Sequence, residues 1–152
     1  MKHVDIHKDF QLYGESFSSI DKLLRFASKS STPVFQFLSM WFSADDYIKI
    51  NTSGSTGRPK LIALKKEFMI NSALATGAFF DVKENTTALL CLPIEYIAGK
   101  MMLVRAFVLG WHIDVVAPTS KPLNGLDKQY DFTAMVPMQL QNSLAELHKI
   151  KK

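Results

Sequence analysis

Short apolar runs alternate with longer, helix-like segments over most of the second half of the chain, and this alternation constrains the fold more than any other feature. Residues 66–80 and 97–109 have the length and apolar spacing of helices. The short runs at 87–92, 113–117 and 132–136 are typical of strands. Strands that alternate with helices of this length predict βαβ units. The expected fold class is therefore α/β, with a largely parallel sheet flanked by helices.

The first 45 residues instead predict helices. The segment Ser16–Lys29 places its apolar residues on one face at helical spacing. Pro33 fits the first turn of a second helix, Pro33–Phe42, which is apolar nearly all round and should be well buried. A last helix is expected at Pro137–Lys149, again with a proline in its first turn. We expect residues 1–152 to form a single domain, with a helical leader at 1–45 and an α/β part at 46–152.

Composition is that of an ordinary globular domain, with 47% hydrophobic and 21% charged residues. The 152 residues fit one domain. The net charge of +4 comes from lysines and arginines that are scattered along the chain. Scattered charge does not favour nucleic acid as a partner and fits a small phosphorylated ligand better.

The sequence also predicts a cytoplasmic protein without a membrane span. Its single cysteine, Cys91, lies in an apolar run, cannot form an intramolecular disulfide and should be a small buried hydrophobe. The residues after Met1 lack the apolar stretch of a signal peptide. The longest apolar region, Tyr96–Trp111, is interrupted by Lys100 and Arg105 and falls short of the roughly 20 residues that cross a bilayer. The four histidines are dispersed, so no metal site made of protein side chains is expected.

The segment with the strongest chemical signal is Thr52–Lys60, TSGSTGRPK. Asp46–Asn51 alternates like a strand, and Leu61–Leu64 predicts a second strand, so the segment should join the two strands of a β-hairpin. Its glycines let backbone N–H groups approach an anion, its hydroxyls donate hydrogen bonds, and Lys60 supplies a charge. This combination favours polyphosphate binding. The segment is expected to be exposed and mobile without nucleotide.

Two other interpretations fit this segment less well. It is not a Walker A motif, because its glycines are three apart, Pro59 precedes the lysine and Leu61 follows it. An ordinary Ser/Thr/Gly linker is the second alternative, although a linker has no need of Arg58-Pro59-Lys60.

The segment TSGSTGRPK resembles the signature loop of the adenylate-forming superfamily, which includes acyl-CoA synthetases, luciferases and the adenylation domains of peptide synthetases. A second segment, Leu92–Gly99 (LPIEYIAG), is similar to the family's L-P-x-x-H-x-x-G segment, which opens a helix lining the acyl pocket. Tyr96 stands where many members have histidine, which puts any role of an imidazole there in doubt. The resemblance extends from about Asp46 to the end of the chain.

The resemblance implies an ATP-dependent, AMP-forming acid–CoA ligase. A carboxylic acid would attack the α-phosphorus of ATP and release pyrophosphate, and CoA would then displace AMP. Mg²⁺ would arrive with the nucleotide. Lys60 is the implied catalytic residue, because it would steady the departing pyrophosphate. The implied ATP phosphate-binding residues are Thr52, Ser53, Gly54, Ser55, Thr56, Gly57 and Lys60.

Within the superfamily the chain is most similar to the o-succinylbenzoate–CoA ligases of menaquinone synthesis. The signature loop begins only about fifty residues into the chain, and the stretches Asn71–Gly77 and Gly99–Met102 also resemble these ligases. The implied acid-binding residues are Tyr96, Gly99 and Arg105. Two alternatives stay open: Tyr96 as a core aromatic residue, and Arg105 as an exposed or ion-paired helix residue.

The family motifs for adenine, for the ribose hydroxyls and for the catalytic lysine of the C-terminal domain are not found in the sequence. We therefore expect an N-terminal fragment of a larger ligase, a partial N-terminal domain that is inactive alone and whose partner is the rest of the same enzyme. The alternatives are another acyl- or aryl-CoA synthetase or adenylation domain, a non-catalytic phosphate- or acyl-binding module, or an unrelated α/β protein whose loop is only a linker.

Overall fold

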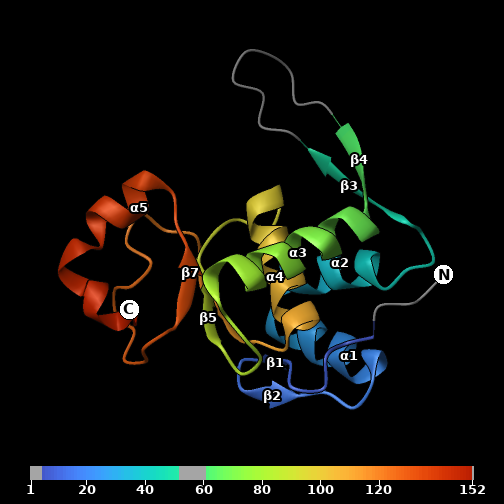
Figure 1. Cartoon of the computed structure of the whole chain (residues 1–152), viewed down its shortest axis with the longest axis horizontal. Coiled ribbons are helices and arrows are strands. Elements are labelled where there is room, and N and C mark those ends of the chain that lie inside the picture. Colours follow the sequence, from blue (N-terminus) through green and yellow to red (C-terminus); the bar gives the residue numbers. More distant parts are fainter. Residues whose placement is uncertain (1–4, 52–60, 152) are drawn as a thin grey trace.

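A five-stranded, mostly parallel sheet forms the centre of the computed structural model, which describes residues 5–51 and 61–151 (Figure 1). The strand order is β2-β1-β6-β5-β7, and within the described part of this sheet only β1 and β2 pair antiparallel. The α/β class and the largely parallel sheet are therefore confirmed. The strands are β1 (Gln11–Leu12), β2 (Glu15–Ser16), β5 (Thr87–Leu90), β6 (His112–Val115) and β7 (Phe132–Ala134).

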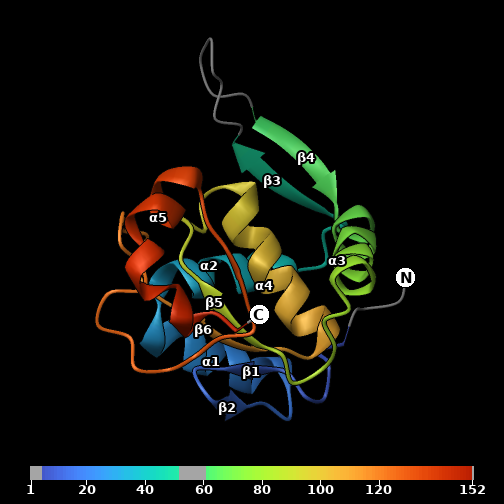
Figure 2. The same ribbon diagram turned by 60° about the vertical axis from the view of Figure 1, so that its left-hand side comes forward.

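Helices cover both faces of this sheet, and the side chains of β5 show how. Ala88 and Leu90 join the large core formed with four helices, whereas Leu89 and Cys91 join a second core on the other face. Such continuous burial is typical of a central parallel strand. Figure 2 shows α3 and α5 on opposite sides of the molecule. The large core takes side chains from four helices: α1 (Ile20–Ser30), α2 (Thr32–Trp41), α3 (Lys66–Phe80) and α4 (Ile97–Leu109). The 3₁₀ helix η1 (Leu144–Lys149) packs Leu147 against the second core, and α5 (Pro137–Asn142) reaches it through a hydrogen bond from Gln139 to Cys91 O.

The predicted helical leader is corrected by the structure, because β1 and β2 lie within residues 1–45. Gln11 and Leu12 pair in parallel with His112 and Ile113, so the sheet extends into the leader. Two-residue strands leave no alternating pattern in the sequence, and their turn has positive φ at Tyr13 and Gly14. The first helix also starts later than expected, at Ile20.

The predicted C-terminal helix is the second correction. Residues 137–149 form two short pieces, α5 and η1, rather than one helix. The tighter winding of η1 places Lys149 against another segment: its carbonyl accepts a hydrogen bond from Tyr130 N, and its ammonium donates to Leu123 O. These long-range contacts compete with continuous α-helical hydrogen bonding and have no signature in the local sequence.

The β-hairpin expected around the signature segment is present. β3 (Tyr47–Asn51) and β4 (Leu61–Lys65) pair antiparallel and project away from the central sheet (Figure 1). Lys66 anchors the base of the hairpin, because its ammonium donates to Ser43 O at 3.0 Å. Burial lowers the pKa of Lys66, and the nearby acidic residues Asp45 and Asp46 oppose this shift.

The predicted helices at 66–80 and 97–109 are confirmed. The predicted strands at 87–92, 113–117 and 132–136 are present but end two residues earlier than expected. No helix in the described parts of the chain has the length and apolar character needed to cross a bilayer. Cys91 is buried and forms no disulfide, as predicted.

Asp131 provides a test of how the sheet is tied together. Its Oδ2 accepts hydrogen bonds from both the N–H and the hydroxyl of Thr87, and its Oδ1 lies 3.0 Å from Lys151 Nζ. Burial would raise the pKa of Asp131, but the Thr87 hydrogen bonds and Lys151 outweigh it and lower the pKa. The carboxylate therefore stabilises the fold above the pKa of an unfolded Asp, and this contribution is lost as pH falls through the lowered folded pKa.

We predict that Asp131→Asn lowers the free energy of unfolding by about 1 kcal/mol at pH 7, since one charge-assisted acceptor is weakened. Urea unfolding at pH 7 and near pH 3 measures the effect. The control is Asp127→Asn, which removes the same charge from an exposed position. A deficit of the same size at both pH values would contradict the assigned role of the carboxylate.

Candidate functional site

The carboxyl ends of the three parallel strands β5, β6 and β7 meet at one edge of the sheet, where α/β proteins commonly bind ligands. A crevice of about 300 Å³ lies at this edge. Its walls come from the turn after β5 (Leu92–Glu95), the segment at the end of β6 (Val115–Pro118), Tyr13 and the start of α2. The structure thus places the second family-like segment, Leu92–Gly99, beside a cavity.

Most of the side chains that line the crevice are apolar. Three prolines, Pro33, Pro93 and Pro118, line it together with aliphatic side chains. The polar groups are few: Ser30 and Ser31 at the junction of α1 and α2, the Tyr13 hydroxyl, whose pKa is raised by burial, and the Glu95 carboxylate. No lysine or arginine of the described chain lines it. An apolar pocket with a few polar groups suits the organic part of a ligand better than a polyphosphate.

One buried glutamine links the chain at the ends of all three strands. Gln139, in α5, is 4% exposed. Its Nε2 donates to Cys91 O and to Thr119 O, both at 2.9 Å, and its Oε1 accepts from Val136 N. These three partners follow β5, β6 and β7 respectively. Gln139 therefore fixes the edge of the sheet on which the crevice opens.

Tyr96 lies at the amino end of α4 and is 48% exposed. Its N–H donates to Pro93 O at 3.3 Å, which closes the turn between β5 and α4. The alternative of Tyr96 as a core aromatic residue is wrong, since half of its surface is accessible to solvent. Its ring is therefore free to contact a ligand.

Gly99 has a packing role that its residue type explains. It is buried in the first turn of α4, directly against the turn after β5. A Cβ placed on Gly99 would collide with the carbonyl group of Pro93 and with Ile94 Cα. Only glycine lets the helix approach the turn this closely.

Lys100 is the residue of this segment that the sequence analysis missed. It is 6% exposed, and its ammonium donates to Ile94 O and Glu95 O, both at 2.7 Å. Burial lowers its pKa, and the Glu95 charge opposes the shift. A lysine inside the apolar helix Ile97–Leu109, immediately after a glycine, was the signal that could have revealed it.

Arg105 does not line the crevice. It points toward α3, where its Nε donates to Thr76 Oγ1 at 3.1 Å. Burial lowers its pKa. Among the described residues no carboxylate lies within ion-pair distance of Arg105, so the ion-paired alternative finds no support there. Nine residues of helix separate it from Tyr96, about 13 Å along the axis, so the structure does not bring these two together.

The predicted phosphate-binding residues Thr52, Ser53, Gly54, Ser55, Thr56, Gly57 and Lys60 lie outside the described residues. Their framework is described: β3 precedes them and β4 begins directly at Leu61. A strand after the loop differs from the helix that follows a Walker A loop. The segment therefore joins the two strands of a hairpin, as predicted.

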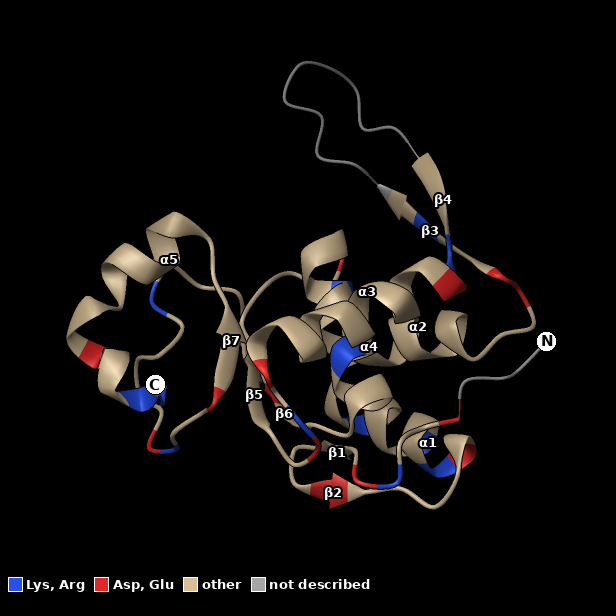
Figure 3. Cartoon of the chain, viewed as in Figure 1, with Lys and Arg blue, Asp and Glu red and all other residues tan. Residues whose placement is uncertain are grey.

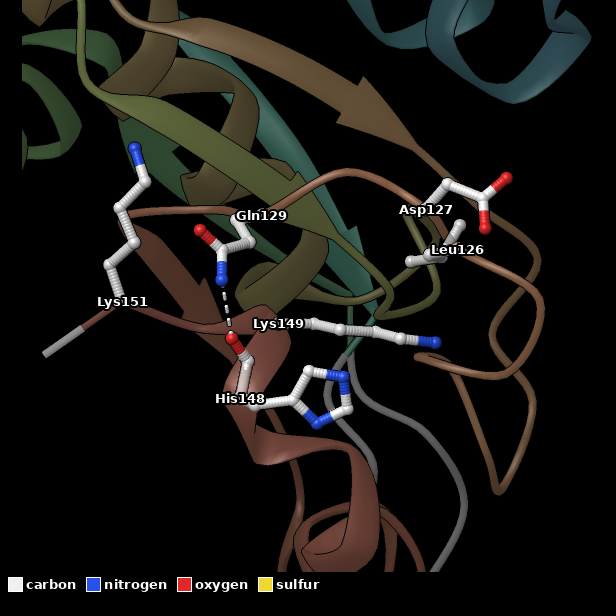
Figure 4. Close-up of a pocket in the computed structure, with 6 residues that line it drawn as sticks. All are labelled: Leu126, Asp127, Gln129, His148, Lys149 and Lys151. Atoms are coloured by element: carbon white, nitrogen blue, oxygen red, sulfur yellow. Dashed lines mark hydrogen bonds between the residues drawn. The ribbon is translucent and has the colours of Figure 1, made fainter.

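A second hollow, of about 670 Å³, lies near the carboxyl end of the chain (Figure 4). Its lysines already have partners: Lys149 Nζ donates to Leu123 O and contacts Glu146, and Lys151 contacts Asp131. Gln129 donates to the backbone carbonyl of His148, as Figure 4 shows. Among the described residues no unpaired cations converge here, so this hollow is a weaker candidate site than the crevice.

The charge distribution adds little to the site. Basic and acidic residues are interspersed along the ribbon and leave much of α3 and α4 without charge (Figure 3). Within residues 5–51 and 61–151, no group of three or more His, Cys, Asp or Glu residues could hold a metal ion.

Comparison with known proteins decides the family. The model of the AMP-binding enzyme family matches residues 11–151. The chain belongs to the AMP-binding enzyme family. The region matched includes the hairpin, the crevice and α4, so the two family-like segments fall within it. No curated protein matches the chain.

Solved structures of AMP-binding enzymes resemble this chain. An acyl-CoA synthetase (AMP-forming)/AMP-acid ligase II-like protein from Dyadobacter fermentans is 42% identical, with a TM-score of 0.70 over 77% of this chain and 34% of its own. An o-succinylbenzoate CoA synthetase from Bacillus subtilis, in complex with the acyl-adenylate intermediate, is 17% identical, with a TM-score of 0.57 over 87% of this chain and 44% of its own. A MenE variant from E. coli, with bound OSB-AMS, is 21% identical, with a TM-score of 0.52 over 67% of this chain and 22% of its own.

These likenesses differ in what they support. At 17% and 21% identity, the two latter structures support the fold alone. The chain spans between about a fifth and less than half of the length of the three proteins. The expected partial domain of an adenylate-forming enzyme agrees with this fold.

Gly99 gives a test of the site geometry. We predict that Gly99→Ala lowers the free energy of unfolding by about 1–3 kcal/mol, as over-packing usually does, because the new methyl group meets backbone atoms. Gly77→Ala is the matched control: it also adds a methyl group within a helix, but there the nearest atoms belong to the Leu109 side chain, at 3.1 Å.

The control should be close to neutral, since helix propensity favours alanine by about 1 kcal/mol and offsets the tight contact. Thermal and urea unfolding measure both variants. Equal stability of the two variants would show that the turn can move away from α4.

Proposed function

We propose that this chain is part of an ATP-dependent, AMP-forming acid–CoA ligase. The observation that carries the proposal is the nine-residue segment Thr52–Lys60, held between β3 and β4 within the region matched by the AMP-binding enzyme family. Its hydroxyl groups, backbone amides and lysine suit the β- and γ-phosphates of ATP. The setting proposed for the enzyme is the cytoplasm.

In the proposed reaction, an oxygen of the acid's carboxylate attacks the α-phosphorus of ATP, and the bond to pyrophosphate breaks. The thiolate of CoA then attacks the acyl carbon of the adenylate, which releases AMP and forms the thioester. Lys60 and the loop amides would stabilise the negative charge on the departing pyrophosphate, which is how preorganised donors accelerate such steps. Mg²⁺ would enter with the nucleotide, because the described residues offer no cluster of their own for it.

We assign the organic acid to the region around Tyr96 and α4. The exposed Tyr96 ring can lie against the acid, and Gly99 lets the helix approach the turn. Arg105 is a half-buried guanidinium with only Thr76 and Met102 as described partners, so it retains donors for a carboxylate. Because Tyr96 and Arg105 lie about 13 Å apart along the helix axis, an acid that contacts both residues would have to extend along α4.

The acid we favour is o-succinylbenzoate, with another aryl or aliphatic acid as the alternative. Its two carboxylates would leave one for reaction and one for Arg105. The resemblance of Asn71–Gly77 and Gly99–Met102 to o-succinylbenzoate–CoA ligases supports this choice. The decisive measurement is thioester formation by the full-length ligase with a panel of carboxylic acids. Preference for a fatty acid over o-succinylbenzoate would reject the assignment.

For the 152-residue chain alone we predict weak binding of Mg-ATP or pyrophosphate and no adenylate formation. Two or three charge-assisted hydrogen bonds contribute roughly 5–8 kcal/mol in total. Ordering the loop costs about 1–2 kcal/mol per residue over several residues. The dissociation constant should therefore be about millimolar or weaker. We expect adenine and ribose contacts to come from the rest of the enzyme.

Calorimetry and a pyrophosphate-release assay test this prediction. Lys60→Ala should weaken the residual binding further, whereas Lys49→Ala, which removes an exposed lysine from the same hairpin, should not. Pyrophosphate release above background with any acid would contradict the expected inactivity. Nucleotide binding that is insensitive to Lys60 would favour a different phosphate site, and binding without any turnover in the full-length protein would favour a non-catalytic module.

A further inference from the structure

The turn between β5 and α4 rests on a buried ammonium group. Lys100 lies in the first turn of α4 and reaches back to two successive carbonyl groups, Ile94 O and Glu95 O, at 2.7 Å each. With the residue 6% exposed, these hydrogen bonds form away from bulk water. They are therefore stronger than the same contacts would be at the surface.

The position is unfavourable for a lysine in several respects. Burial disfavours its charge, and a cation in the first turn faces the positive end of the helix dipole. Fixing the long side chain also removes rotamer freedom. The Glu95 charge partly offsets the effect of burial, but no carboxylate of the described chain forms an ion pair with Lys100. Departures from local rules of this kind are expected at functional sites.

What the lysine provides is a fixed turn. Two adjacent carbonyl groups that converge on one ammonium cannot rotate independently, so Pro93–Tyr96 is held in a single shape. The backbone contacts Tyr96 N to Pro93 O and Lys100 N to Tyr96 O complete the arrangement. This turn forms one wall of the crevice and ends at the exposed Tyr96.

We propose that Lys100 is a positioning residue for the acid site. It does not touch the acid, because its ammonium faces the turn and is buried. It holds the backbone that places the Tyr96 ring and the crevice wall at Ile94 and Glu95. The proposal rests on the proposed function for the nature of the ligand, but the shape of the turn can be measured without any ligand.

Lys66 is a matched control within the same chain. It is also a buried lysine, 8% exposed, in the first turn of a helix, and its ammonium also donates to a backbone carbonyl, Ser43 O. It differs in two ways: two acidic residues, Asp45 and Asp46, lie close to it, and it serves the base of the β3–β4 hairpin. Its replacement should leave the turn after β5 unchanged.

The first experiment measures amide hydrogen exchange by NMR in the 152-residue chain and in Lys100→Met, Lys100→Arg and Lys66→Met. In Lys100→Met, the amides of Tyr96 and of position 100 should exchange about tenfold faster or more, the size expected for loss of a charge-assisted hydrogen bond. Amides in the second half of α4 should not change. Lys100→Arg should restore slow exchange to within about threefold, since a guanidinium can donate to both carbonyls.

Unchanged exchange at Tyr96 in Lys100→Met would overturn the proposal. Equal acceleration along all of α4 would also overturn it, because the lysine would then only stabilise the helix. Failure of Lys100→Arg to restore slow exchange would show that the charge is not what holds the turn.

The second experiment adds o-succinylbenzoate and follows the amide shifts of Tyr96 and Gly99. The amide shifts of the wild type and of Lys100→Arg should respond over the same range of acid concentration. Lys100→Met should need an acid concentration at least about fivefold higher for the same response, since a turn that is not held must be ordered on binding. Equal responses in all variants would overturn the positioning role. No response in any variant would reject the acid site of the proposed function, while the exchange data would still decide whether Lys100 holds the turn.

Discussion

The parallel pairing of β5 with β6 and β7 is the constraint on which the rest of the described structure depends. The backbone of β5 is hydrogen-bonded along both edges. Along β5 and the residue after it, the side chains enter the two cores alternately: Ala88 and Leu90 on one face, Leu89 and Cys91 on the other. A strand held on four sides cannot slip without moving buried groups to the wrong core. The chain therefore leaves β5 at a fixed point, and the turn that carries Tyr96 begins there.

Buried polar groups then set the shape of the loops, which apolar packing alone does not specify. Gln139 joins backbone groups that follow β5, β6 and β7, Lys100 holds the turn after β5, and Asp131 ties the start of β7 to the start of β5. Each of these side chains satisfies backbone groups that would be expensive to bury unpaired. Directional contacts of this kind explain why a crevice lined mostly by apolar side chains has definite walls.

The sequence predicted the regular elements well where local patterns are strong. The helices at 66–80 and 97–109, the three parallel strands and the β3–β4 hairpin follow from periodicity and from length. The predictions from sequence failed where tertiary contacts determine the secondary structure. The two-residue strand β1 forms against the edge of β6, and β2 pairs only with β1. The last helix divides where Lys149 contacts Tyr130 and Leu123. Neither effect leaves a local pattern.

The sequence by itself determined the α/β class, the hairpin around Thr52–Lys60 and the resemblance to adenylate-forming enzymes, because these depend on residue type and spacing along the chain. Only the tertiary structure decided what single side chains do. In the folded chain Arg105 points toward Thr76, Tyr96 is exposed, and the Lys100 ammonium donates hydrogen bonds to two carbonyl groups. The reason is that Thr76, the partner of Arg105, and Cys91 and Thr119, the partners of the Gln139 amide nitrogen, lie twenty or more residues away in sequence. The contacts of Lys100 in turn require Gly99 to bring α4 against the turn. Contacts between residues that are far apart in sequence cannot be read from any short segment of it.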